Sequence, residues 1–98
     1  MNRDEVIATL QAHQQELRRR GILHAAVFGS VARREERSDS DIDILVELEP
    51  GQSLDVFAYA GLKRFIAGLF PLSVDVINEA ALKRGLREPV RRDAVYAF

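Results

Sequence analysis

The feature that most constrains this chain is a strictly alternating segment at residues 41–48, DIDILVEL. Successive side chains of a β-strand point to opposite faces of the sheet, so this segment predicts a strand with one apolar face. That face would be formed by Ile42, Ile44, Val46 and Leu48. The other face would begin with two carboxylates, Asp41 and Asp43. A sheet with an apolar face is stable only when other elements cover it.

Helical and extended patterns alternate along the rest of the chain. Apolar residues recur at helical spacing over residues 4–20 and 53–69. Two short apolar segments, at residues 22–28 and 73–77, predict further strands. We expect a turn of helix and a loop at residues 30–40, and one or two short helices at residues 78–98. This order predicts an α/β or α+β fold, although the direction of the 22–28 strand relative to the 41–48 strand stays open.

Local residues support the predicted ends of the two long helices. Asn2 or Asp4 suits the N-cap of the first helix, and Gly21 suits its end. Ser53 suits the N-cap of the second helix, and Pro71 prevents its continuation. We expect the aromatic residues of this region in the core: Phe57, Tyr59, Phe65 and Phe70.

Size and composition exclude several classes of protein. A chain of 98 residues predicts one domain, residues 1–98, with one modest core. The absence of cysteine excludes disulfides, Cys-ligated metals and a cysteine nucleophile. A net charge of −1 argues against a nucleic-acid-binding surface. No apolar run is long enough to span a membrane, and the first twenty residues do not resemble a signal peptide, so we expect a cytoplasmic protein.

Three aspartates carry the most specific chemistry. Asp41 and Asp43 would lie about 6–7 Å apart along one strand face, where two carboxylates repel each other unless a cation lies between them. Mg²⁺ prefers such carboxylates together with substrate phosphates. Asp75 interrupts an apolar strand. If that strand lies beside the first, three carboxylates share one patch and can hold two metal ions.

Gly29 and Ser30, directly after the 22–28 strand, suit the binding of a phosphate. Glycine lets the backbone approach an anion closely, and the Ser30 hydroxyl adds a donor. Arg33 and Arg34 could supply positive charge. An EF-hand is excluded because Ile44 and Pro50 stand where its loop needs Gly and Glu, and no dinucleotide-binding or Walker A glycine motif is present.

The pattern Gly29-Ser30, ten residues, Asp41-x-Asp43 resembles the signature of the DNA polymerase β-type nucleotidyltransferases. The segments FGSVAR, from Phe28, and SDIDILV, from Ser40, resemble more narrowly the minimal nucleotidyltransferases, including the MntA-like antitoxins. The resemblance covers essentially the whole chain, and Asp75 falls where the third carboxylate of the family is expected. Arg34 departs from the pattern, since many relatives have glycine there.

The resemblance implies a small mixed sheet with packed helices and a Mg²⁺-dependent transfer of a nucleoside monophosphate, with release of pyrophosphate. Asp41 and Asp43 would bind Mg²⁺, two ions in all, and Asp75 would assist by activating the incoming hydroxyl. Gly29, Ser30 and Arg33 would hold the nucleoside triphosphate, which we expect to be ATP. Some members of the family pair with a HEPN-domain toxin and adenylylate one of its tyrosines.

Ordinary structural roles compete with each assignment. Asp41 and Asp43 alone would suit the solvated face of a strand, and Asp75 would suit a sheet edge. Ser30 alone would suit a helix N-cap, and Arg33 a surface ion pair. Two functions stay open besides the enzyme that modifies a partner toxin. One is an antitoxin that binds its toxin by occlusion without catalysis, and the other, disfavoured by the net charge, is modification of nucleic-acid ends.

Overall fold

A computed structural model describes residues 1–35, 37, 40–51 and 54–98 of the chain. Its centre is a four-stranded sheet in the order β3-β2-β1-β4. The strands are β1 (Ile22–Phe28), β2 (Ile42–Leu48), β3 (Val74–Asn78) and β4 (Val95–Tyr96). β1 runs antiparallel to both β2 and β4, whereas β2 and β3 are parallel. The expected small mixed sheet is therefore confirmed.

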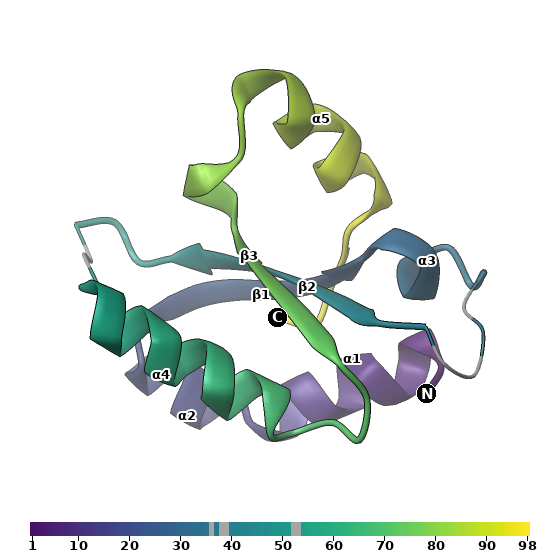
Figure 1. Cartoon of the computed structure of the whole chain (residues 1–98), viewed down its shortest axis with the longest axis horizontal. Coiled ribbons are helices and arrows are strands. Elements are labelled where there is room, and N and C mark those ends of the chain that lie inside the picture. Colours follow the sequence, from purple (N-terminus) through teal and green to yellow (C-terminus); the bar gives the residue numbers. More distant parts are fainter. Residues whose placement is uncertain (36, 38–39, 52–53) are drawn as a thin grey trace.

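Helices cover the two faces of this sheet unequally (Figure 1). One face carries α1 (Arg3–Ala12), α2 (Gln14–Arg19) and α4 (Val56–Ala67). The short α3 (Gly29–Ala32) follows β1 directly, and the 3₁₀ helix η1 (Glu79–Ala81) follows β3. α5 (Arg84–Asp93) lies on the opposite side of the sheet from α1, α2 and α4. In the part of the chain that the structure describes, no helix has the length and apolarity needed to cross a membrane.

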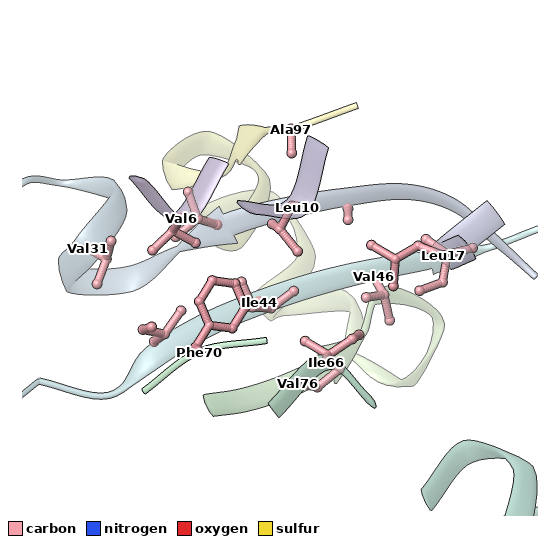
Figure 2. Close-up of a cluster of buried hydrophobic side chains, with 14 of the residues drawn as sticks. Val6, Leu10, Leu17, Val31, Ile44, Val46, Ile66, Phe70, Val76 and Ala97 are labelled. Carbon is pink, nitrogen blue, oxygen red and sulfur yellow. The ribbon is translucent and has the colours of Figure 1, made fainter. Parts of the chain in front are cut away.

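The core lies between the sheet and the three helices of the first face (Figure 2). Alternate residues of β2 point into it, as the pattern predicted, because each has an apolar neighbour on an adjacent strand. Ile44, for example, pairs with Val27 of β1 and Val76 of β3. The helices contribute Val6, Leu10, Leu17, Leu62 and Ile66. The other face of β2 is left to Asp43, Leu45 and Glu47.

The predicted single helix over residues 4–20 is wrong, because two helices meet at His13. The His13 backbone N–H donates to Leu10 O at 3.1 Å, which closes a tighter turn than an α-helix makes. Its Nδ1 lies 2.9 Å from Thr9 O, and its ring packs edge-on against Phe65. Asn2 is the N-cap, as one of the two candidates, and forms a capping box with Glu5.

Other boundaries also differ from the predictions. Asp41 lies just before β2 rather than in it. α4 begins at Val56 because Asp55 accepts a hydrogen bond from the Ala58 N–H at 2.7 Å, whereas the predicted cap, Ser53, lies outside the described residues. Phe57 was expected in the core but is 86% exposed. Phe70 is buried, as expected, and Tyr59 and Phe65 are partly buried against the core.

The C-terminal strand β4 was not predicted. Val95 and Tyr96 pair with Val27 and Ala26 at the open edge of β1, and the Ala97 N–H donates to Ala25 O at 2.8 Å. A strand of two residues is too short to show an alternating pattern. The pairing follows from tertiary contact and not from local sequence.

Candidate active site

The register of β2 and β3 brings two of the three predicted carboxylates together. Asp43 and Asp75 are direct partners in the parallel pairing. Neighbouring strands lie about 4.8 Å apart, so both side chains leave the same face at adjacent positions. The condition set by the sequence, that the strand of Asp75 lies beside the strand of Asp43, is therefore met.

Gly29 packs directly against the Asp43 carboxylate. Phe28 pairs with Asp43 across the antiparallel β1–β2 ladder, which places the next residue, Gly29, at the side chain. A Cβ added at Gly29 would overlap Asp43 Oδ2 and lie 3.2 Å from its Cγ. Gly29 also has a φ of +74°, a left-handed conformation that side chains disfavour. Glycine is thus needed twice at this position, once for its backbone and once to make room for the carboxylate.

The surroundings of Asp43 oppose its negative charge. Partial burial is the main cause that raises the pKa of Asp43, and the charges of Asp75 and Asp41 raise it further. The nearby charge of Arg33 acts in the opposite direction and lowers this pKa. Three carboxylates and one guanidinium are therefore close enough to influence one another.

Asp41 and Asp75 are exposed, so the carboxylate patch opens to solvent. Within the described residues, no three acidic or histidine side chains already converge as a metal site. Carboxylate oxygens are ligands that Mg²⁺ prefers, but the structure does not hold these carboxylates in the arrangement of a complete metal site. Ser30 follows Gly29 in α3, and its hydroxyl makes no hydrogen bond to the described part of the chain.

Arg33 is engaged by two carboxylates. Its Nε donates to Glu35 Oε2 at 3.1 Å, and its Nη1 donates to Asp93 Oδ2 at 2.9 Å. These ion pairs are the ordinary role that competed with phosphate binding at the sequence level. Its contact with phosphate stays a prediction.

Sequence reasoning missed three residues near the site. Glu35 and Asp93 bond to Arg33, but no sequence pattern distinguished either of them. Asp93 is 60 residues away from Arg33 in the chain. Tyr59 was assigned to the core, yet it lies near Asp75. Burial raises the pKa of Tyr59, a hydrogen bond with the Asn78 backbone lowers it, and the charge of Asp75 raises it. Residues outside the motif can be recognised as neighbours of the site only from the folded structure.

A cavity of about 420 Å³ lies elsewhere on the molecule, at the opposite end of β2. Its lining includes Glu47, Glu79 and Arg87. None of the predicted site residues contributes to it. We place the candidate site at the carboxylates, because charge and register converge there and not at this cavity.

The chain is also similar in sequence to known proteins. The family model of the nucleotidyltransferase domain matches residues 10–97. The protein adenylyltransferase MntA of Thermococcus cleftensis is 39% identical over 94 residues, which cover 95% of this chain and 93% of that protein.

Solved structures show the same fold. A protein assigned as a minimal nucleotidyltransferase superposes with a TM-score of 0.79 at 39% identity, covering 97% of this chain and 95% of the other. A second structure contains a tri-AMPylated HEPN toxin of Shewanella oneidensis in complex with an MNT antitoxin. It matches with a TM-score of 0.65 at 20% identity, covering 94% of this chain and 71% of the other. At that identity the second likeness shows the fold alone.

Proposed function

This chain belongs to the nucleotidyltransferase domain family, and we propose that it is a protein adenylyltransferase that transfers AMP from ATP to a hydroxyl of a partner protein. The observation that carries the proposal is the in-register pair Asp43 and Asp75 packed beside Gly29. This arrangement sets carboxylates against a glycine-serine turn at one end of the sheet. Adenylyl transfer needs both parts, one for the reacting oxygens and one for the triphosphate.

The proposed step is an in-line displacement at the α-phosphorus of ATP. The acceptor oxygen forms a bond to this phosphorus, and the bond from the phosphorus to the oxygen that bridges to the β-phosphate breaks. Pyrophosphate leaves, and the acceptor hydroxyl gives its proton to the Asp75 carboxylate, which is exposed and open to an incoming group. Gly29 and Ser30 hold the triphosphate through the backbone and the Ser30 hydroxyl.

Asp41 and Asp43 are the proposed ligands for Mg²⁺, with Asp75 as a third. Their crowding fits this role, since burial and mutual repulsion raise the pKa of Asp43 and a divalent cation would relieve the repulsion. Bound Mg²⁺ would supply positive charge that neutralises the phosphate oxygens.

The proposed acceptor is a tyrosine of a HEPN-domain toxin, with this chain as its antitoxin. Two observations support the class of acceptor. The adenylyltransferase relative shares nearly the full length of this chain, and the fold is shared with an MNT antitoxin bound to an AMPylated HEPN toxin. The exposed position of Asp41 and Asp75 also leaves the reacting end accessible to a protein-sized acceptor.

A label-transfer assay tests the proposal. The protein would be incubated with Mg²⁺, α-³²P-labelled ATP and a co-expressed HEPN-domain protein. We expect label on the partner with the wild type, and a loss of at least about 100-fold with Asp41→Ala/Asp43→Ala. The matched control is Glu47→Gln, which removes a carboxylate from the same face of β2 at its other end and should keep full activity.

Each outcome separates the alternatives. Label that depends on Asp41 and Asp43 but appears on another protein would retain the adenylyltransferase and reject the HEPN acceptor. A stable complex with the partner, without label from any nucleotide, would reject catalysis and favour an antitoxin that acts by occlusion. Full activity of the double variant would overturn the metal assignment.

A further inference from the structure

Arg33 joins the candidate site to the C-terminal helix. It is the C-cap of α3, the short helix that contains Ser30. Its guanidinium bonds to Asp93, the last residue of α5, at 2.9 Å. The charge of Arg33 also reaches Asp43, whose pKa it lowers. One side chain thus contacts α5 and acts on the carboxylate patch.

The donors of Arg33 are only partly used. A guanidinium has five N–H groups, of which Glu35 and Asp93 engage the Nε and one Nη1 hydrogen. Within the described residues, Nη2 makes no hydrogen bond. The side chain is 44% exposed, so the remaining donors are accessible to an anion. Asp93 therefore fixes one edge of the guanidinium and leaves another for a ligand.

The position of Asp93 is not explained by its own helix. A carboxylate in the last turn of a helix faces the negative end of the macrodipole, which is unfavourable. Its compensating contact is the ion pair with Arg33. α5 buries no residue of its own in the core, and the chain next pairs with β1 at Val95, beyond the end of the helix.

We propose that Asp93 is a positioning residue for nucleotide binding, which holds the Arg33 guanidinium so that its remaining donors meet the distal phosphates of the triphosphate. The inference rests on the proposed function for the identity of the ligand. Asp93 itself touches neither the nucleotide nor the reacting atoms. Its role is to reduce the conformational freedom that Arg33 would lose on binding.

The test measures binding of a non-hydrolysable ATP analogue with Mg²⁺ by calorimetry, and the KM for ATP and kcat of transfer. Asp93→Asn should weaken binding and raise KM by about three- to five-fold, the range of a partly exposed ion pair. We expect kcat to change less than about two-fold, since the distal phosphates are remote from the reacting phosphorus. Arg33→Ala should weaken binding by about ten-fold or more, as a charged hydrogen bond is lost.

A double-mutant cycle separates positioning from general stability. In the Arg33→Ala background, Asp93→Asn should have no further effect on binding. Glu88→Gln is the matched control, because it removes a charge from the same helix at an exposed residue and should bind as the wild type. An equal loss from Asp93→Asn with and without Arg33 would overturn the proposal. Tighter binding by Asp93→Asn would also overturn it, by showing that Asp93 competes with phosphate.

The calorimetry also distinguishes this inference from the proposed function. If the wild type binds the analogue and transfers no AMP, the proposed function fails while the effect of Asp93 on affinity is still measured. If Asp93→Asn binds as the wild type and transfer proceeds, the inference alone fails. If the wild type binds no nucleotide, both are rejected.

Discussion

Asp43 shows at the scale of one residue how a candidate site opposes the stability of the fold. Its pKa is raised, mainly by burial and then by Asp75 and Asp41. A carboxyl with a raised folded-state pKa contributes stability below its unfolded pKa of about 3.9, and this contribution is lost as pH rises through the folded-state pKa. At neutral pH the ionised Asp43 therefore destabilises the metal-free protein.

The first prediction follows from this destabilising effect of the ionised Asp43. Asp43→Asn should raise the midpoint of thermal unfolding at pH 7 in the presence of EDTA, because a neutral amide of nearly the same shape removes the repulsion. The gain should shrink as pH is lowered toward about 3.5, where the wild-type carboxyl is protonated as well. Glu47→Gln, at the other end of the same strand face, serves as the control. A lower midpoint for Asp43→Asn at pH 7 would contradict the argument.

The backbone conformation of Arg34 gives a physical reason for the glycine that the family pattern has at this position. Arg34 has a φ of +59°, and within the described residues it is the one non-glycine residue with a positive φ. The Arg34 N–H donates to Val31 O at 3.1 Å, and the Glu35 N–H donates to Ser30 O at 2.8 Å. These two bonds form the Schellman motif, in which glycine is favoured at the position of Arg34. The resemblance described above implies glycine at this position, and the backbone geometry supplies a physical reason for it.

The second prediction is that Arg34→Gly stabilises the protein by about 0.5–1 kcal/mol. Relief of the left-handed conformation gains about 1–2 kcal/mol, and the added freedom of glycine in the unfolded chain removes part of it. The ion pair with Asp4, at 3.5 Å and exposed, contributes little. Denaturant unfolding measures the change, and Arg34→Ala is the control that loses the ion pair without relieving the backbone. Equal effects of the two variants would refute the explanation.

At the scale of elements, α4 and α5 are held to the rest of the protein by different kinds of contact. α4 buries Leu62 and Ile66 in the core. α5 buries no residue and is attached by polar contacts, including Arg91 to Glu79 and Asp93 to Arg33. Arg87 adds bonds to the carbonyls of Leu82 and Ala80 at 3.2 and 3.3 Å. Apolar burial is insensitive to ionic screening, whereas an ion pair exposed on both sides, such as Asp93 with Arg33, is weakened by salt. Glu79 is buried, so salt screens its pair with Arg91 less.

The third prediction is therefore a difference between these helices in salt. Raising NaCl from about 0.1 to 1 M shortens the Debye length from about 10 to 3 Å. Hydrogen exchange at the α5 amides should become several-fold faster, while exchange in α4 should stay unchanged. α4 is the internal control, since its core contacts do not depend on charge. Unchanged protection of α5 at high salt would mean that another contact holds it.

The elements that sequence alone predicted well are those with a strong local pattern. β1 matches its predicted range, and β2 differs only at Asp41. The break at His13 was missed because the flanking apolar residues keep a helical spacing across it. Phe57 was misplaced because the helical spacing of α4 was extended through its exposed first turn. Tertiary context decided these cases.

The residues of the candidate site also differ in whether a local sequence pattern was enough to predict them. Gly29, Ser30, Asp41 and Asp43 lie in one short motif, so their spacing was visible in the sequence. The juxtaposition of Asp75 with Asp43 depended on a parallel register that only the fold supplies. Asp93 reaches Arg33 from a helix with no motif of its own, which is why its contact could not be anticipated.

At the scale of the whole molecule, the proposed site lies at one end of a small sheet and lacks a complete set of ligands for a metal ion. The radius of gyration is 12.7 Å, about that expected for a compact domain of this length. Asp43 and Asp75 share a face, yet within the described residues the carboxylates do not converge into a ready metal site. Phosphate oxygens of the nucleotide are the natural additional ligands for Mg²⁺. Metal and nucleotide should therefore bind as one unit.

The fourth prediction is a synergy in thermal stability. ATP with Mg²⁺, at about 100 times the dissociation constant, should stabilise the fold by about 2.7 kcal/mol, equivalent to about 10 °C or more in the unfolding midpoint. ATP in EDTA and Mg²⁺ alone should each give a small shift, and the two shifts should sum to less than the combined effect. Asp41→Ala/Asp43→Ala should lose the synergy, while Glu47→Gln should keep it. A full shift by ATP in EDTA would show that the nucleotide binds without a metal, and the carboxylates would then need another explanation.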